Sequence, residues 1–381
     1  MWTLSDEQQM LRDSALRFVE SEYTFERRRS DLEKTSTYEP DLWRQFAELG
    51  WLGIPFSEMH GGLDGTNIDL VVLFEALGKG LVVSPMLANV VLAGNLIART
   101  NEEASDQLLP DLIAGELQLA FAYAEPQARY DLFDVESTAV SSATGYTLTG
   151  KKTLVLNAPD ATHIVVSART EGASRDQRGI SLFLVPADTD GVRLKSYRTN
   201  DDHIAADISF DAVALPPSAL LGEAGEALPI IEEVVDIATV ALAAEGIGAM
   251  DAVMELTTEY LKTREQFGKP IGKNQALQFR MVEMFYALEE SRSMLQWAAT
   301  ALDSGPAARR TAVSAMKVKL GETARFIGQQ GVQLHGAIGL TDEYSVGHYY
   351  KRLESIRLLF GDPDHHLARY GRWSEAQNQS A

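Results

Sequence analysis

The stretch of sequence that decides the fold runs from residue 238 to residue 280 and reads ATVALAAEGIGAMDAVMELTTEYLKTREQFGKPIGKNQALQFR. Its first half repeats apolar residues every three or four positions, at Val240, Ala243, Ala244, Ile247, Met250, Val253, Met254 and Leu261. This spacing predicts a long helix that is buried on at least one side. One carboxylate, Glu245, interrupts its most apolar part. The pattern breaks at residues 266–270, where glycine and then proline are typical stop signals, and a second helix is predicted from about Asn274.

The residues before this stretch divide into a helical part and a β-rich part. Ser5 precedes two acidic residues and is a predicted helix cap, and helical spacing follows at residues 9–20, 39–49, 68–77 and 101–113. From about 119 to 222 the pattern changes to short alternating or β-branched runs, at residues 119–123, 137–141, 146–148, 153–156, 163–168, 180–185 and 206–210. Turn residues separate these runs, which is typical of a small β-barrel or sandwich.

Helical periodicity returns from Ala227 to about Tyr370, with breaks near Gly268, at residues 304–306 and at residues 336–341. This order of helices, strands and helices predicts an α+β protein with segregated layers. We expect three consecutive domains: an N-terminal helical domain at 1–118, a middle β-barrel-like domain at 119–222 and a C-terminal four-helix bundle at 223–381. A length of 381 residues agrees with two or three domains.

The composition excludes several classes of protein. A net charge of −20 would repel the phosphates of a nucleic acid. The chain has no cysteine, which rules out disulfides and agrees with a reducing cytoplasm. We also predict no metal site, because no acidic cluster accompanies the histidine pair His365-His366. The first 19 residues lack the basic and apolar regions of a signal peptide, and Pro85 with polar neighbours makes residues 81–98 a poor membrane span. We therefore expect a cytoplasmic protein without nucleic-acid or membrane partners.

The break after the long helix carries a family resemblance. Tyr260, Arg264, Gln266, Phe267, Gly268, Pro270 and Ile271 resemble the YxxxRxQFGxPI signature of the acyl-CoA dehydrogenase family. A plain helix-turn-helix explains the glycine and the proline, but not the ordered arginine, glutamine and phenylalanine before them. The resemblance covers nearly the whole chain and implies the family's fold, with FAD as the cofactor. It also implies that Arg264 and its neighbours reach the FAD of an adjacent chain, where a planar guanidinium suits a pyrophosphate.

A second loop extends this resemblance. Residues 333–339, QLHGAIG, are similar to the family's QxxGGxG loop, with Ala337 in place of one glycine. Glycines let backbone amides approach phosphate or adenosine oxygens. The resemblance therefore adds Gln333, His335, Gly336 and Gly339 to the cofactor-binding residues Arg264, Gln266 and Phe267. A helix C-cap followed by a turn would give the same glycines, and His335 taken alone is more typical of a packed histidine.

The reaction that the resemblance implies is α,β-dehydrogenation of an acyl-CoA thioester, in which a carboxylate removes the α-proton and the β-hydrogen leaves as hydride to flavin N5. In many relatives the base is the glutamate of a Tyr-Glu-Gly-Thr turn, but the matching turn here has Gly361. A minority place the base near the start of the long helix, where this chain has Ala238. Glu245, two turns further along that helix, is the remaining candidate for the catalytic base. A structural glutamate bonded to an arginine or to amides is the alternative, and Asp362 is a second candidate base.

The middle domain departs from the family where a flavin would lie. Residues 121–131, FAYAEPQARYD, resemble the TEPxAGSD loop, but Ala124 replaces the threonine and Arg129-Tyr130 replace glycine and serine. Residues 152–157, KTLVLN, resemble the K-x-W-I-T/S-N strand, with Leu154 in place of a stacking tryptophan and Leu156 in place of a hydroxyl. A leucine cannot donate a hydrogen bond to a flavin, so this part of the chain's own flavin seat is predicted to be incomplete.

These differences point to one arrangement. The chain resembles the small subunits of pimeloyl-CoA dehydrogenases and related bacterial heteromeric acyl-CoA dehydrogenases, in which a well-equipped subunit pairs with a degenerate one. The resemblance implies an α2β2 heterotetramer, with a homotetramer as the alternative, an electron-transfer flavoprotein as the redox partner, and a place in fatty-acid or steroid side-chain degradation. A non-catalytic partner subunit that completes the FAD site, and an acyl-CoA oxidase, are the competing functions.

Overall fold

The computed structural model describes residues 3–33 and 38–379, and the chain divides into two compact units. One unit comprises Met1–Ser30, Asn67–Val82 and Thr239–Ala381, and the other comprises Asp31–Thr66 and Val83–Ala238. The units interleave along the chain, because the helical segment before residue 118 contributes to both. Helix α7 (Leu228–Thr263) begins in the second unit and continues in the first.

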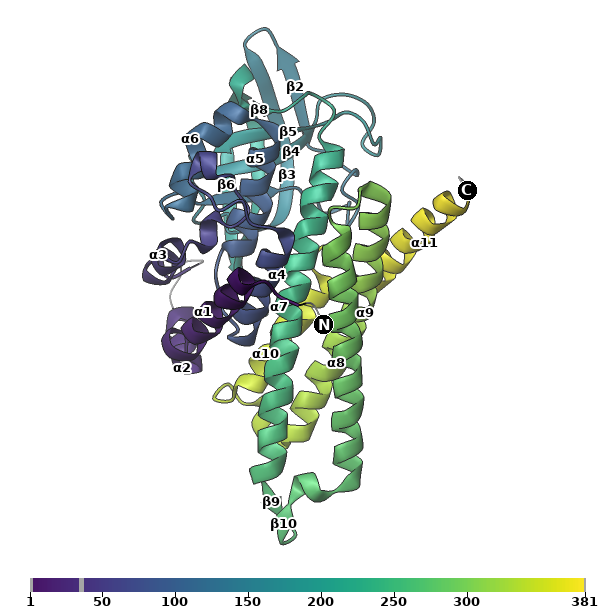
Figure 1. Ribbon diagram of the computed structural model, residues 1–381. Coiled ribbons are helices and arrows are strands. Elements are labelled where there is room, and N and C mark those ends of the chain that lie inside the picture. The colour runs from purple at the N-terminus through teal and green to yellow at the C-terminus, as the bar shows by residue number, and fades with distance from the viewer. Residues whose placement is uncertain (1–2, 34–37, 380–381) are drawn as a thin grey trace. The chain divides into compact units, whose positions relative to one another are not determined.

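The first unit is helical. Its elements are α1 (Asp6–Glu22), most of α2 (Phe25–Leu32), α4 (Asn67–Lys79), the greater part of α7, the hairpin β9 (Glu265–Gln266) and β10 (Lys269–Pro270), η5 (Ile271–Lys273), α8 (Gln275–Ala301), α9 (Pro306–His335), η6 (Gly336–Leu340), α10 (Ser345–Leu358) and α11 (Pro363–Gln379). Helix α9 packs on α8, α10 and α11, and the hairpin lies at the end of α7, where it leads into α8 (Figure 1). The predicted C-terminal helical domain and its break at the glycine-proline turn are confirmed.

Two glycines let α4 and α7 cross in direct backbone contact. A Cβ atom on Gly78 would lie 2.0 Å from the carbonyl oxygen of Glu245, and a Cβ atom on Gly248 would lie 1.8 Å from that of Glu75. No side chain fits at either position, so the two helices approach more closely than an ordinary helix pair. This crossing fixes the position of Glu245 on α7 relative to α4.

The second unit contains a mixed sheet and short helices. Its strands are β1 (Leu119–Ala122), β2 (Thr138–Ser142), β3 (Gly145–Leu156), β4 (His163–Arg169), β5 (Ile180–Pro186), β6 (Val192–Arg198), β7 (Ile204–Leu215) and β8 (Leu220–Leu221). The strand order is β6-β7-β3-β2-β4-β5-β8, and β1 pairs with β4 in parallel. Leu148, Ile164, Phe183 and Ile208 are buried in its core. The predicted β-rich middle of the chain is confirmed.

The helical elements of the second unit are α3 (Pro40–Glu48), η1 (Trp51–Gly53), η2 (Glu58–His60), η3 (Leu87–Gly94), α5 (Asn95–Thr100), α6 (Glu102–Ile113) and η4 (Pro217–Ala219). Residues 81–98, which the sequence indicated to be a poor membrane span, include the π-helix η3. Every residue of η3 is buried. In the described part of the chain only α7 is long and apolar enough to cross a membrane, and 89% of its most apolar window is buried within the protein. That degree of burial is typical of a core helix.

Candidate functional site

The hairpin after α7 presents the first set of predicted cofactor residues. Phe267 and Gly268 form its tip with φ angles of 55° and 76°, and the phenylalanine side chain is 97% exposed. The exposed guanidinium of Arg264 makes no hydrogen bond or ion pair with any residue in 3–33 or 38–372. The amide of Gln266 folds back onto the carbonyl oxygen of Glu265 at 2.8 Å. The hairpin thus offers an exposed cation and an exposed aromatic ring, neither of which contributes to the fold.

The second predicted loop begins where α9 ends. Gly336 has φ 65° and ψ −141°, a conformation that only glycine adopts readily, and a Cβ atom there would meet nothing within 4 Å. Gln333, one turn earlier, is exposed. Gly339 is buried, and a Cβ atom there would lie 3.0 Å from the carbonyl oxygen of Val332. The loop is therefore open to another molecule at Gly336 and packed against its own helix at Gly339.

His335 lies between these two segments and is only 2% exposed. Its Nδ1 atom lies 2.7 Å from the carbonyl oxygen of Gly331, and its Nε2 atom lies 3.2 Å from the hydroxyl of Tyr344. The rings of Tyr260 and Tyr344 lie 4.6 Å and 4.9 Å from the histidine ring. Burial lowers the pKa of His335, so the ring is neutral. Both ring nitrogens of His335 are thus engaged inside the chain, which leaves neither for direct contact with a cofactor.

Glu245, the predicted base, is paired inside the first unit. Its Oε1 atom accepts from Arg352 Nε at 2.6 Å, and its Oε2 atom accepts from Arg352 Nη2 at 2.8 Å. Both side chains are buried, and the fork-to-fork geometry uses both carboxylate oxygens. This is the structural alternative considered from the sequence, a glutamate held by an arginine. The geometry therefore favours a structural Glu245 over a catalytic one.

The turn at Gly361 has no room for a base. Gly361 has φ 122°, and a Cβ atom on it would lie 2.6 Å from His366 Nε2 and 2.8 Å from His365 Cδ2. Asp362, the second candidate base, accepts a hydrogen bond from the backbone N–H of His365 at 2.8 Å and caps α11. Ala238, the third position considered, is buried within α7. The two histidines after the turn thus occupy the space into which a side chain at 361 would project.

A buried lysine and a buried histidine fix this turn. Lys317 of α9 donates to the carbonyl oxygens of Ile356 at 2.5 Å and Leu359 at 2.8 Å, and burial lowers its pKa to about 7. His366 donates from Nε2 to the carbonyl oxygen of Phe360 at 3.1 Å. Burial, and then the nearby Lys317 charge, lower the pKa of His366 to about 2. The turn is therefore held by hydrogen bonds from buried side chains of the same unit.

Strand β3, which contains the residues that resemble the family's flavin-binding strand, carries a buried ion pair and a bulge. Lys152 Nζ donates to Glu125 Oε1 at 2.7 Å, with both side chains buried, and burial lowers the lysine pKa to about 8. The pairing of β3 with β7 shifts between Lys152 and Val155, and Leu154 in this bulge has φ 52° and is 40% exposed. The amide of Leu154 donates to Asp207 Oδ1 at 3.3 Å. Leu154 thus offers neither a side-chain donor nor a free amide.

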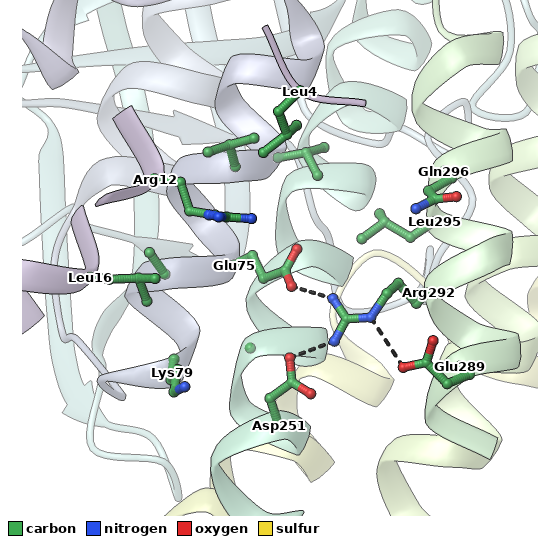
Figure 2. Close-up of a pocket in the computed structure, with 14 residues that line it drawn as sticks. Leu4, Arg12, Leu16, Glu75, Lys79, Asp251, Glu289, Arg292, Leu295 and Gln296 are labelled. Atoms are coloured by element: carbon green, nitrogen blue, oxygen red, sulfur yellow. Dashed lines mark hydrogen bonds and ion pairs between the residues drawn. The ribbon is translucent and has the colours of Figure 1, made fainter. Parts of the chain in front are cut away.

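A separate cavity of about 360 Å³ in the first unit is lined by Leu4 and by residues of α1, α4, α7 and α8. Figure 2 shows its lining side chains. Arg292 of α8 donates to Glu75 and Asp251 and lies 3.5 Å from Glu289. Burial disfavours the Arg292 charge, but Glu75 and Asp251 outweigh this effect and raise the arginine pKa. None of the predicted site residues lines this cavity. Its polar wall is therefore an ion-pair network between packed helices.

Arg352 and Tyr344 were not identified from the sequence, because they carry no motif and meet their partners through tertiary packing. His366 was named only in connection with a metal site, and its burial was not predicted. Only the glycine at 361 hinted at a special backbone conformation. Among the residues that the structure describes, no group of three or more histidine, aspartate or glutamate side chains is arranged to hold a metal ion.

Comparisons with known proteins agree with this architecture. Three family models match, the N-terminal, middle and C-terminal domains of acyl-CoA dehydrogenase, over residues 5–116, 120–213 and 228–374. The caffeyl-CoA reductase-Etf complex subunit CarC of Acetobacterium woodii is 30% identical over 353 residues, which cover 91% of this chain and 92% of that protein. The probable acyl-CoA dehydrogenase YngJ of Bacillus subtilis is also 30% identical over 353 residues, with 90% and 91% covered.

Solved structures show the same fold. Butyryl-CoA dehydrogenase from Megasphaera elsdenii superposes with a TM-score of 0.89 at 26% identity, covering 98% of this chain and 99% of that chain. A variant of the Tcur3481-Tcur3483 steroid ACAD gives a TM-score of 0.88 at 29% identity, with 100% of each chain covered.

This chain belongs to the acyl-CoA dehydrogenase family. It is therefore an FAD-dependent oxidoreductase, and FAD is the cofactor. The hairpin and the loop fit that cofactor, because Arg264 is an exposed cation, and Gly268 and Gly336 leave space beside the backbone. The strand at Leu154 fits it poorly, because Leu154 and Leu156 supply no hydrogen-bond donor from their side chains.

Proposed function

We propose that this chain is the degenerate subunit of a heteromeric acyl-CoA dehydrogenase and completes the FAD site of a different, larger subunit. The observation that carries the proposal is the exposed hairpin, in which the Arg264 guanidinium makes no hydrogen bond or ion pair with the chain's described side chains and backbone, and Phe267 is 97% exposed. A guanidinium has five N–H donors in a planar fork. The pyrophosphate of an FAD bound to another chain would accept hydrogen bonds from the Arg264 donors that have no acceptor within this chain's described residues. The complex is an α2β2 heterotetramer.

The proposed reaction is the α,β-dehydrogenation of an acyl-CoA thioester. When bound, FAD supplies the acceptor for the hydride that leaves the β-carbon. In this division of labour Arg264 holds the pyrophosphate, and the Gly336 loop allows close approach of backbone amides. The base that removes the α-proton comes from the larger subunit, because Glu245 is paired with Arg352 and Gly361 has no side chain.

An apolar surface on α8 supports a protein partner. Phe279, Val282, Phe285 and Tyr286 are 59%, 48%, 52% and 63% exposed. Four large apolar side chains within eight residues of one helix are unusual for a free surface and typical of a protein interface. We assign this surface to a subunit of the same fold, since such a subunit must approach the hairpin at the N-terminal end of the same helix.

Relatives support the choice of partners. One is named as a subunit of a caffeyl-CoA reductase-Etf complex, which supports an electron-transfer flavoprotein as the redox partner of this chain. Another carries the double name Tcur3481-Tcur3483 and is a steroid ACAD, which supports a two-chain enzyme and a steroid or fatty acyl-CoA substrate. Consistent with the charge and the lack of cysteine, we place the complex in the cytoplasm.

The test is to purify the chain alone and together with a larger acyl-CoA dehydrogenase subunit of the same organism, and to measure bound FAD by absorbance. We expect little or no FAD with the lone chain and full occupancy in the complex. Stoichiometric FAD in the lone chain would overturn the proposal. Peroxide release on addition of an acyl-CoA would instead identify an oxidase.

The competing assignment makes Glu245 the base, and one variant separates the two. Glu245→Gln keeps the size of the side chain and removes its basicity. If the larger subunit supplies the base, the complex should retain a rate within a few-fold of wild type. Loss of more than about a hundredfold in turnover, with FAD still bound, would assign the base to this chain.

A further inference from the structure

We infer that His335 is a positioning residue, which holds the Gly336–Leu340 loop in register with Arg264 for the FAD of the partner subunit. The inference rests on the proposed function. It concerns the alignment of two segments, one after α7 and one after α9, that must act on one ligand.

The hydrogen bonds define one state of the histidine ring. The carbonyl oxygen of Gly331 can only accept, so the Nδ1 atom of His335 carries the proton and donates to it at 2.7 Å. The Nε2 atom is then a lone-pair acceptor, and the Tyr344 hydroxyl donates to it at 3.2 Å. The ring is thus neutral and held in a single tautomer. One bond ties it to α9, and the other ties it to the segment that follows the η6 loop.

The ring contacts extend this link to α7. Tyr260 packs on His335 with a centroid distance of 4.6 Å, and Tyr260 stands one helical turn before Arg264. The backbone N–H of Arg264 donates to the carbonyl oxygen of Tyr260 at 2.8 Å. The position of the Arg264 backbone therefore follows that of Tyr260. His335, which immediately precedes Gly336, sets the distance between the arginine and the loop.

The far end of the same segment is held in a similar way. His348 of α10 donates from Nε2 to the carbonyl oxygen of Asp342 at 3.1 Å, and its Nδ1 atom accepts from Arg28 at 3.1 Å. The segment 336–344 is therefore fixed at Tyr344 by one neutral histidine and at Asp342 by another. Between these points Ile338 and Leu340 are 41% and 78% exposed. The loop is anchored from inside while its outer surface stays free for a ligand.

Burial distinguishes this role from direct contact. His335 is 2% exposed and both of its ring nitrogens are used, so a cofactor on the loop surface would meet Gln333 and Gly336 before it met the histidine. Removing the histidine should then weaken FAD binding by displacing those groups, without removing a contact.

The experiment compares variants of the FAD-loaded complex. Tyr344→Phe removes only the hydroxyl, His335→Phe removes both hydrogen bonds but keeps a ring, and Arg264→Ala removes the proposed pyrophosphate contact. Ser291→Ala is the matched control, because it breaks a buried bond of 2.8 Å between α8 and α9, to Thr323, away from the loop. The FAD dissociation rate is measured by flavin fluorescence after dilution, and the melting temperature of each lone chain is measured in parallel.

We expect dissociation to accelerate about 3- to 10-fold in Tyr344→Phe and about 10- to 30-fold in His335→Phe, as one and then two hydrogen bonds are lost. Ser291→Ala should lower the melting temperature as much as Tyr344→Phe does and leave the dissociation rate unchanged. A wild-type rate in His335→Phe, or equal acceleration in Ser291→Ala, overturns the inference. If Arg264→Ala accelerates dissociation and His335→Phe does not, only this inference fails; if Arg264→Ala has no effect either, the proposed function fails.

Discussion

Two of the first unit's turns with a positive-φ glycine, at Gly268 and Gly361, differ in the space that they leave beside the backbone. At Gly268, in the hairpin, a Cβ atom would meet nothing within 4 Å, whereas at Gly361 it would lie 2.6 Å from His366. The hairpin leaves space and an exposed arginine beside it. The turn at 361 is filled by its own chain. The difference shows that the backbone at Gly268 is open to its surroundings, whereas the space that a side chain at residue 361 would occupy is filled by the chain itself.

The same contrast separates Arg264 from Arg352. The Arg264 side chain is exposed and makes no hydrogen bond or ion pair with the described residues, while the Arg352 side chain is buried and gives two hydrogen bonds to Glu245. An arginine that contributes nothing to the fold is available for a ligand, and an arginine that neutralises a buried carboxylate is not. Four stability measurements test this division.

The largest expected effect is at the buried ion pair. Arg352→Met leaves the Glu245 carboxylate buried without its cation, which should reduce the free energy of unfolding by about 3–5 kcal/mol. Urea denaturation of the lone chain measures this loss. The double variant Glu245→Leu/Arg352→Met is the control, since replacing both partners with apolar side chains should recover most of the stability. A loss of stability below about 1 kcal/mol in the single variant would mean that the buried Glu245 carboxylate does not need the Arg352 cation. Glu245 would then again be a candidate for the catalytic base.

The turn at the hairpin could be predicted from the sequence, but the ion pair between Glu245 and Arg352 could not. The order of Arg264, Gln266, Phe267 and Gly268 is local, so a motif predicted both the turn and its exposed residues. The bidentate bond between Glu245 and Arg352 joins α7 to α10 across 107 positions, and no periodicity in either helix indicates it. The alternatives for Glu245 could therefore be stated from the sequence, but choosing between them needed the tertiary structure.

The elements show the same limit. Ser5 was predicted as a cap, and it accepts from the backbone N–H of Gln8 while the Gln8 side chain accepts from the Ser5 N–H. Residues 146–148 and 153–156 were predicted as two strands and form one, because β3 continues through bulges while paired to β7. Strand β6 was missed, since its sequence VRLKSYR alternates apolar residues with charged ones on an exposed edge of the sheet. The local sequence predicts helix caps and motifs, whereas an edge strand forms by pairing with a neighbouring strand, and the local sequence does not show that pairing.

The second expected effect tests whether the interior closes the turn at 361. The pKa of His366 is about 2 in the folded chain against an ordinary value near 6.5, so the unfolded chain binds a proton first as the pH falls. The stability from the neutral His366 is fully present above pH 6.5 and is lost below it, by about 2–3 kcal/mol at pH 4.5. Urea denaturation between pH 7.5 and 4.5 measures the slope. His366→Leu should show a shallower slope by that amount, and equal slopes would contradict the burial of a neutral imidazole.

A smaller effect is expected at the glycine itself. Gly361→Ala requires a side chain at φ 122° and places its Cβ atom 2.6 Å from His366 Nε2, which should cost about 1–3 kcal/mol. Gly305→Ala is a matched control, because Gly305 has φ 90° but nothing within 4 Å of the added carbon. Thermal unfolding of the two variants separates crowding from backbone strain. If both lose the same stability, the histidines do not fill the position at 361, and a base could be restored there.

The smallest change in the free energy of unfolding is expected at the hairpin. A small change would indicate that the exposed hairpin side chains do not stabilise this chain. Arg264→Ala and Phe267→Ser remove side chains that are exposed and make no hydrogen bond or ion pair within the described chain, so the free energy of unfolding of the lone chain should change by no more than about 0.5 kcal/mol. The native fold gives no reason for an arginine beside a phenylalanine that is almost fully exposed to water. Urea titrations of the two variants and of wild type measure the difference. A loss above about 1 kcal/mol would show that the hairpin serves this chain's own stability, and the contrast between the open and the closed turn would then no longer point to a ligand from another subunit.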